Sequence, residues 1–111
     1  MLNITSILSN HIFYAISLKS NVERLSSLPN ALIKDTPVTD ERLAAYGLLD
    51  QILAANFNAS INDLIKDDLG CPRSVNECDF WVSIAHSGDL VAASASALGP
   101  IGIDVESFYS W

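Results

Sequence analysis

Residues 79–106 read DFWVSIAHSGDLVAASASALGPIGIDVE, and this stretch decides the fold. It contains three short runs rich in β-branched and small apolar residues: 79–86, 90–97 and 100–106. Such runs are typical of strands. Ser87-Gly88-Asp89 separates the first run from the second, and Gly99-Pro100 separates the second from the third; both are turn signals. Three short strands with tight connections predict an antiparallel meander.

The residues before this meander predict one long helix and one further strand. The helix covers about 40–56, is capped by Thr39 or Asp40, and carries an apolar stripe at helical spacing: Ala45, Tyr46, Leu49, Ile52 and Leu53. An apolar and aromatic cluster within residues 10–19 predicts a strand. We therefore expect an α+β fold, in which a small antiparallel sheet, made of the C-terminal meander and the N-terminal strand, packs against the long helix.

Two short helices are also predicted from capping boxes, S-x-x-E at residues 20–23 and S-x-x-D at residues 60–63. The first helix covers about 21–28 and leads into a loop over 30–38. The second runs to about Asp68, because a glycine and a proline follow it.

Length and charge limit the classes of protein that fit. The 111 residues suit one small domain spanning the whole chain, and half of them are apolar, so a modest core can form. So short a chain is still marginally stable, and pairing with another half would help it. The net charge of −7, from 6 basic and 13 acidic residues with no basic cluster, argues against a nucleic-acid partner. An acidic protein should also repel anionic ligands unless local groups or a divalent cation reverse the sign at the site.

Nothing in the sequence predicts export or membrane insertion. The N-terminus lacks a basic region followed by an apolar run, so we expect no signal peptide. No apolar stretch approaches the roughly 20 residues of a membrane span. Cys71 and Cys78 have no zinc-like spacing with other ligands, and we expect free thiols in a reducing cytosol, with a disulfide as the alternative. The predicted location is the cytoplasm.

The last run places two carboxylates on one side of the chain. In a strand over 101–106 the side chains alternate, so Gly102, Asp104 and Glu106 share the face away from the core. Asp104 and Glu106 would then stand roughly 6.5–7 Å apart at Cβ, twice the rise per residue. Mg²⁺ prefers one or two carboxylates together with water and substrate phosphate. The pair predicts a Mg²⁺ site; the alternative is the ordinary polar face of a half-buried strand.

Two turns carry further candidates. His86 ends a predicted strand, and the backbone N–H groups of Ser87 and Gly88 in the following turn can bind an anion. A histidine there can donate a hydrogen bond to phosphate, and a structural histidine is the alternative. The turn over residues 70–74 carries little information by itself.

Arg42 is the candidate on the long helix. It precedes Tyr46 and Leu49 on the apolar stripe, so it should lie at the N-terminal edge of the buried face and be aimed at the domain. The alternative is an arginine that snorkels to solvent from a helix end.

Three motifs, taken in order, resemble the 4′-phosphopantetheinyl transferases that serve polyketide, peptide and fatty-acid synthetases. The family shows a G-K-P turn, an S-H-S strand end and a G-(I/V)-D-x-E strand. Here they stand as Gly70-Cys71-Pro72, Ala85-His86-Ser87 and Gly102-Ile103-Asp104-Val105-Glu106. The match covers about residues 70–106. The small trimeric members carry their metal-binding Asp near the N-terminus, whereas here the corresponding residue is Asp104. The chain therefore resembles the first lobe of the larger, two-lobed members.

The resemblance implies a holo-[acyl-carrier-protein] synthase. This Mg²⁺-dependent enzyme moves the 4′-phosphopantetheine arm from coenzyme A to a serine of an acyl or peptidyl carrier protein. It implies Asp104 and Glu106 as metal ligands and, with His86, as catalytic residues. The residues that it implies in coenzyme A binding are His86, Ser87, Arg42, Gly70, Pro72 and Arg73.

The chain departs from the family pattern at three points. Cys71 replaces the lysine of G-K-P, which removes a cation that would meet a nucleotide phosphate, and Arg73 is a candidate to compensate. Ala85 replaces a serine. The W-x-x-K-E-A helix of the second lobe, which supplies a third carboxylate and a lysine, has no counterpart after Glu106. We therefore expect the chain to need a second lobe, a partner chain or a second copy.

Two other interpretations stay open. The chain could be a truncated, non-catalytic remnant that binds coenzyme A or a partner protein, with Phe108, Tyr109 and Trp111 as an exposed apolar patch. It could also be an unrelated α+β domain in which the motifs match by chance.

Overall fold

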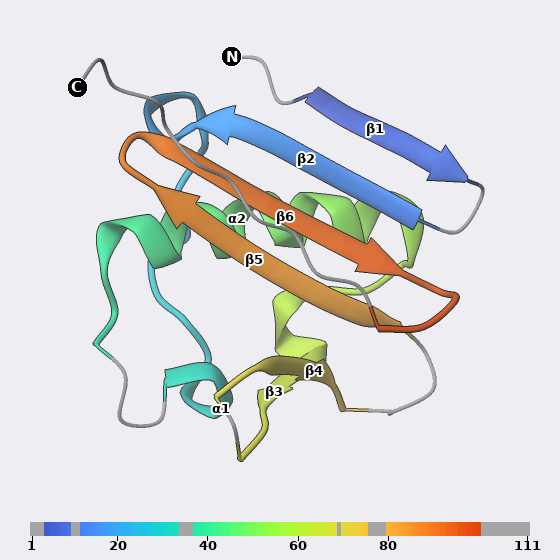
Figure 1. Ribbon diagram of the computed structural model, residues 1–111. Helices are drawn as coiled ribbons and strands as arrows, with labels where there is room; N and C mark the ends of the chain where they lie inside the picture. Colours follow the sequence, from blue (N-terminus) through green and yellow to red (C-terminus); the bar gives the residue numbers. More distant parts are fainter. Residues whose placement is uncertain (1–3, 10–11, 34–36, 69, 76–79, 101–111) are drawn as a thin grey trace.

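A four-stranded antiparallel sheet with one long helix on its face forms the body of the protein (Figure 1). The computed structural model describes residues 4–9, 12–33, 37–68, 70–75 and 80–100. The strands of this sheet lie in the order β1 (Ile4–Ser9), β2 (Ile12–Leu18), β6 (Leu90–Ser96) and β5 (Trp81–Ser87). A second sheet pairs β3 (Leu64–Lys66) with β4 (Pro72–Ser74). The helices are η1 (Lys19–Asn21), α1 (Asn30–Ile33), α2 (Asp40–Asn56) and η2 (Ile61–Asp63). The predicted α+β class, with a small antiparallel sheet against a long helix, is confirmed.

Strand β6 is the centre of the large sheet. It pairs antiparallel with β5 from Ser87↔Leu90 to Trp81↔Ser96, and with β2 on its other side. The connection between β5 and β6 is a two-residue turn whose first residue, Gly88, has φ 56°, a conformation that glycine adopts without steric cost. The N-terminal strand is confirmed as β2, and β1 is a strand that the sequence did not reveal.

The predicted third strand of the meander, 100–106, lies outside the described residues except for Pro100.

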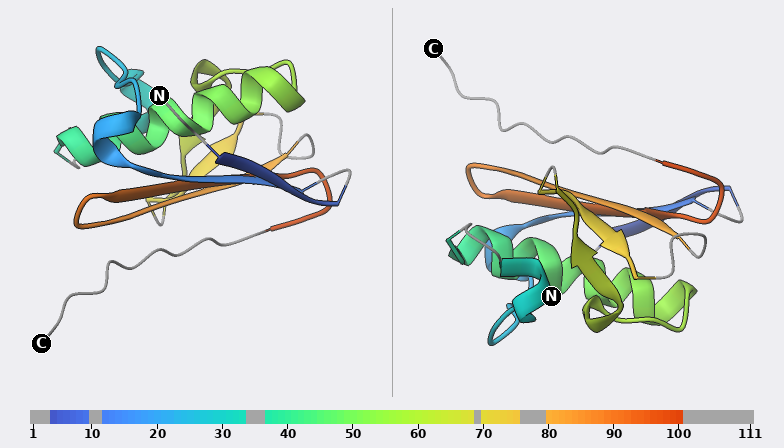
Figure 2. Two further views of the ribbon diagram at one scale, coloured as in Figure 1. Left: turned by 90° about the horizontal axis from the view of Figure 1, so that it is seen from above. Right: turned by 90° about the horizontal axis from the view of Figure 1, so that it is seen from below.

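Helix α2 forms as the sequence predicts, and Thr39 is its cap. The Thr39 side chain accepts a hydrogen bond from the Arg42 backbone N–H at 3.2 Å. The predicted stripe is buried: Ala45, Tyr46, Leu49, Ile52 and Leu53 are each 0–1% exposed. This stripe packs on the face of the sheet formed by Ala15, Val91, Ala93 and Ala95. Figure 2 shows α2 and the small sheet on the same side of the large sheet.

The helix predicted over 21–28 does not form. Of the predicted helix only Asn21 is helical, as the last residue of η1, and the chain then runs beside α2 without helical hydrogen bonds. The Leu25 N–H donates to the Leu43 carbonyl at 3.4 Å, and Val22 and Leu28 are buried in the core. Contacts with α2 thus outweigh the local capping signal. The loop predicted over 30–38 contains the short helix α1.

The second short helix is correct at its start and wrong beyond it. Ser60 and Asp63 form the predicted capping box around η2, with the Ser60 N–H donating to the Asp63 carboxylate at 3.0 Å. The chain then changes to β3, which pairs with β4 through Leu64↔Ser74, Ile65↔Arg73 and Lys66↔Pro72. Cross-strand pairing supplies the backbone hydrogen bonds that a longer helix would have made. In the described part of the chain, no helix has the length and apolar character that crossing a bilayer requires.

Candidate functional site

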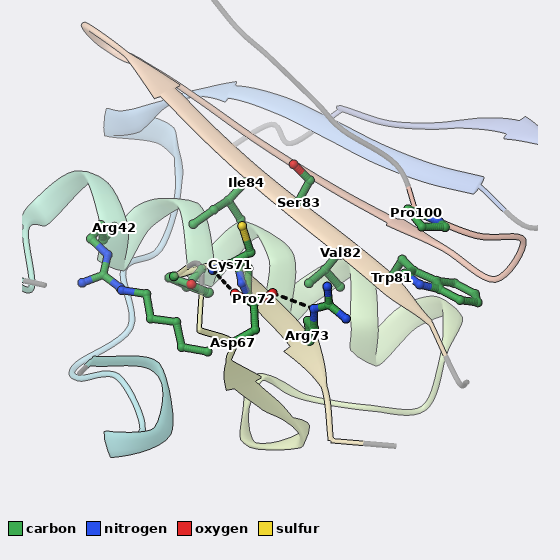
Figure 3. Close-up of a pocket in the computed structure, with 13 residues that line it drawn as sticks. Arg42, Asp67, Cys71, Pro72, Arg73, Trp81, Val82, Ser83, Ile84 and Pro100 are labelled. Carbon is green, nitrogen blue, oxygen red and sulfur yellow. Dashed lines mark hydrogen bonds and ion pairs between the residues drawn. The ribbon is translucent and has the colours of Figure 1, made fainter. Parts of the chain in front are cut away.

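A cavity of about 700 Å³ lies where α2, the β3–β4 hairpin and the edge strand β5 meet (Figure 3). Helix α2 contributes Arg42 and Tyr46 to its wall. Strand β5 contributes the run from Trp81 to Ile84, and Pro100 adds to the rim. The other lining residues come from the hairpin: Lys66, Asp67, Gly70, Cys71, Pro72 and Arg73.

Asp67 builds the turn that forms one wall of this cavity. Its Oδ1 accepts a hydrogen bond from the Cys71 N–H at 2.9 Å. Its own N–H donates to the Cys71 carbonyl at 2.8 Å, and its carbonyl accepts from the Gly70 N–H at 3.0 Å. Gly70 has φ +84°, a backbone conformation that is sterically unfavourable for a residue with a side chain. The Gly70-Cys71-Pro72 motif is therefore a tight, well-bonded turn at the cavity wall.

The charge of the cavity wall is opposite to that of the whole chain. Among the described residues that line it, three side chains, Arg42, Lys66 and Arg73, are basic, and one, Asp67, is acidic. The chain as a whole carries −7. Arg42 is 8% exposed and Lys66 is 7% exposed, so water screens their charges less than it screens surface charges. The local groups thus favour an anion in this cavity despite the acidic net charge.

Arg42 is buried in the domain, as its place on the apolar stripe predicts, and does not snorkel to solvent. Its Nη1 donates to the Pro37 carbonyl at 2.8 Å and its Nη2 to the Leu32 carbonyl at 3.0 Å. The guanidinium carbon lies 5.8 Å from the centre of the Tyr46 ring. Burial raises the pKa of Tyr46, while the hydrogen bond and the charge of Arg42 oppose that rise. Arg42 both anchors the segment before α2 and keeps a positive charge at the cavity.

Arg73 is already paired at the cavity mouth. Its Nε donates to the Asp67 Oδ2 at 2.6 Å, and its side chain is 60% exposed. An exposed pair of this kind is weak, at about 0–1 kcal/mol, yet the adjacent carboxylate reduces the field that Arg73 offers a ligand. That Arg73 replaces the lysine missing at position 71 stays a prediction. Cys71 itself is a free, exposed thiol, and Cys78 lies outside the described residues.

The structure gathers four of the predicted coenzyme A residues at one cavity: Arg42, Gly70, Pro72 and Arg73. His86 and Ser87 do not line it. They end β5, where His86 is exposed on the same side of the sheet as Val82 and Ile84. Asp104 and Glu106, the predicted metal ligands, lie outside the described residues. Within the ranges that the structure describes, no group of three candidate metal-ligating side chains occurs.

Several lining residues were not selected from the sequence, and Lys66 and Trp81 are two of them. Lys66 was placed in a helix, and only the alternation of buried Leu64, exposed Ile65 and buried Lys66 shows that it points inward from a strand. Trp81 was placed in a strand, but the sequence does not show that this strand is the one beside the hairpin.

Comparisons with known proteins point to one class. The chain is similar to two curated proteins, the 4′-phosphopantetheinyl transferases AcpT of Salmonella typhimurium (strain LT2) and of Salmonella typhi. Each is 29% identical to it over 79 residues, which are 71% of this chain and 40% of the relative. The matching segment thus spans about two fifths of the relatives' length. No protein-family model and no solved structure matches the chain.

Proposed function

We propose that this chain is part of a 4′-phosphopantetheinyl transferase, which moves the phosphopantetheine arm of coenzyme A to a serine of an acyl or peptidyl carrier protein. The observation that carries the proposal is the positive cavity at the Gly70-Cys71-Pro72 turn of an acidic chain. Similarity to the two AcpT transferases supports the class of reaction.

The cavity suits the nucleotide end of coenzyme A. A nucleotide combines a flat ring with phosphate groups, so its site needs apolar surfaces beside positive charge. Pro72, Trp81 and Pro100 supply apolar surface, and Arg42 supplies a buried cation on the α2 side. Arg42 is held by two carbonyl groups, so its charge is positioned before the ligand arrives and little order is lost on binding.

The proposed reaction is a substitution at phosphorus. The serine oxygen of the carrier protein forms a bond to the phosphorus that bears the pantetheine arm. The bond from that phosphorus to the bridging oxygen of the pyrophosphate breaks, the serine proton goes to a base, and adenosine 3′,5′-bisphosphate leaves. Asp104 and Glu106 are the residues that would hold Mg²⁺, whose chemistry is to neutralise charge on the pyrophosphate. His86 would donate a hydrogen bond to a phosphate from the end of β5.

The reaction needs a cellular compartment and protein partners. It takes place in the cytoplasm, with a carrier protein as partner, and with a second lobe, a partner chain or a second copy supplying the basic groups and the third carboxylate that the resemblance expects.

The direct test is the mass of a carrier protein. The chain is mixed with coenzyme A, MgCl₂ and a carrier protein that lacks its arm, and the carrier is weighed by intact mass spectrometry. With the remaining part of a related transferase added in trans as the second lobe, we expect the carrier to gain the mass of one phosphopantetheine arm. Asp104→Ala should reduce the rate at least ~100-fold while circular dichroism stays unchanged, since metal ligation carries several kcal/mol of charge stabilisation.

Asp89→Ala is the matched control, because Asp89 is an exposed carboxylate in the β5–β6 turn, away from the cavity lining. It should leave the rate unchanged. Absence of any mass gain, even when the remaining part of a related transferase is added in trans, would refute the proposed function.

A further inference from the structure

Lys66 is a buried lysine at the wall of the cavity, and neither the motifs nor the resemblance assigns it a role. It ends β3, and its Cα pairs with that of Pro72 across the small sheet. Its neighbour Ile65 is 41% exposed, whereas Lys66 is 7% exposed, so the Lys66 side chain faces inward. Lys66 therefore lies directly across the small sheet from the Gly70-Cys71-Pro72 turn.

A buried ammonium group is costly unless polar or anionic groups surround it. Lys66 has contacts within the protein. An ammonium group has three N–H donors, so such contacts do not prevent a ligand from using another donor. Because Lys66 lines the cavity, a ligand that binds there can reach its ammonium group.

The other charges of the cavity indicate what the ligand is. Among the described lining residues the acidic one is Asp67, which accepts hydrogen bonds from Arg73 and from the Cys71 N–H. Arg42 also lines the cavity and is only 8% exposed. Arg42 and Lys66 are thus two buried cations on one cavity wall. Paired basic side chains of this kind suit a phosphate group, because its oxygens accept several charge-assisted hydrogen bonds.

We propose that Lys66 binds a phosphate group of the nucleotide in this cavity and supplies, from β3, the positive charge that Cys71 does not supply from the turn. The inference rests on the proposed function, since it takes the nucleotide end of coenzyme A as the ligand. It makes Lys66, which is buried, a binding residue next to Arg42, whereas the Arg73 side chain is 60% exposed.

The test measures nucleotide binding without the transfer reaction. Adenosine 3′,5′-bisphosphate is titrated into the protein by calorimetry, and adenosine is the uncharged comparison probe. Trp81 lines the cavity, so its fluorescence in a Trp111→Phe background gives a second reading of the same event. We expect Lys66→Met to weaken bisphosphate binding at least tenfold and to leave adenosine binding unchanged. Methionine keeps the apolar stem of the side chain, so the fold should survive; a thermal melt checks this.

Three further variants sharpen the test. Lys66→Arg should keep most of the affinity, because it keeps the charge. The double variant Lys66→Met, Cys71→Lys should bind the bisphosphate several-fold more tightly than Lys66→Met alone. Lys19→Met removes the same charge from the surface, where Lys19 contacts Glu41 at 3.1 Å, and should change affinity less than twofold.

Two results would overturn the assignment of Lys66. One is equal bisphosphate affinity in the parent protein and in a folded Lys66→Met variant. The other is an equal loss of bisphosphate affinity in Lys66→Met and Lys19→Met, which would show that only the net charge of the protein matters. The proposed function fails separately: bisphosphate binding that depends on Lys66, without any transfer to a carrier protein, would contradict the transferase and uphold the phosphate site.

Discussion

The core, meaning α2 with β2, β5 and β6, is built from longer elements than the β3–β4 hairpin and buries more apolar side chains. In the core, Leu49 and Leu53 of α2 are fully buried against the small side chains of Ala93 and Ala95 on β6. The hairpin has strands of only three residues, its turn is bonded to Asp67, and it buries a lysine. The comparison indicates that the core supplies most of the stability, whereas the hairpin supplies much of the polar wall of the cavity.

The largest effect is expected where the core is most tightly packed. Leu49→Ala removes a side chain that is 0% exposed and should lower the free energy of unfolding by about 2–5 kcal/mol. Ile65→Ala truncates an exposed β3 residue and should cost under ~1 kcal/mol. Urea unfolding followed by circular dichroism measures both. Equal costs would break the distinction between core and hairpin.

Gly47 gives a prediction in which the sign matters. A Cβ at this position would lie 2.5 Å from the carbonyl oxygen of Glu23, where backbone must move to make room. Gly→Ala in a helix usually stabilises by roughly 0.5–1 kcal/mol, but here overpacking should reverse the sign and cost about 1–3 kcal/mol.

Ala54→Gly, at an exposed position of the same helix, is the control for Gly47 and should show the ordinary loss of about 1 kcal/mol. A Gly47→Ala variant more stable than the parent in urea would show that α2 does not lie this close to the segment before it.

Asp67 tests the hairpin by separating shape from charge. Asp67→Asn keeps an oxygen that can accept from the Cys71 N–H but loses the charge that faces Arg73. It should leave stability within ~1 kcal/mol and tighten binding of adenosine 3′,5′-bisphosphate several-fold, because the cavity becomes more positive. Asp67→Ala also loses the hydrogen bond to the turn and should cost about 0.5–1.5 kcal/mol. Calorimetric titration and thermal melts measure the two effects, and weaker binding by a folded Asp67→Asn protein would contradict the positive cavity.

The smallest effect concerns acid stability at the start of α2. Arg24 hydrogen-bonds the Asp40 carboxylate and, with Lys19, holds the pKa of Asp40 below its usual value of 3.8. A carboxyl group with a lowered pKa in the folded state stabilises the protein above its unfolded pKa, and this contribution disappears as the pH falls through the folded pKa.

As the pH is lowered from ~5 to ~3, the melting temperature of Asp40→Asn should therefore fall slightly less than that of the parent protein. Asp89→Asn is the comparison variant, because Asp89 is an exposed carboxylate in the turn between β5 and β6. Parallel pH curves for the parent and Asp40→Asn would contradict the role of this ion pair.

The same contrast explains what the sequence could predict. The stripe from Ala45 to Leu53 and the turn at Gly88 are local patterns, and both elements form where expected. Ser20-x-x-Glu23 is an equally clear local signal, yet packing against α2 prevents that helix. In the hairpin, the strand Leu64–Lys66 is too short to show a period, and the capping box of Ser60 and Asp63 led to the prediction of a helix there.

The site divides in the same way. Arg42, Gly70, Pro72 and Arg73 were selected by stripe and motif, and the fold brings them to one cavity. Lys66 joins them only through the pairing of β3 with β4, and Trp81 only because β5 is an edge strand of the large sheet. Strand order and cross-strand register depend on contacts distant in the sequence, which periodicity does not encode. Asp104 and Glu106, which lie outside the described residues, remain predictions.

The most direct test of the account is a titration of ¹⁵N-labelled protein with coenzyme A, followed residue by residue in amide spectra. We predict that four signals from the cavity wall shift together and saturate: the amide signals of Gly70, Cys71 and Ile84 and the indole N–H signal of Trp81. Signals of β2, on the far side of β6, should stay in place. Saturating shifts confined to residues outside the cavity, or none at millimolar coenzyme A, would contradict it.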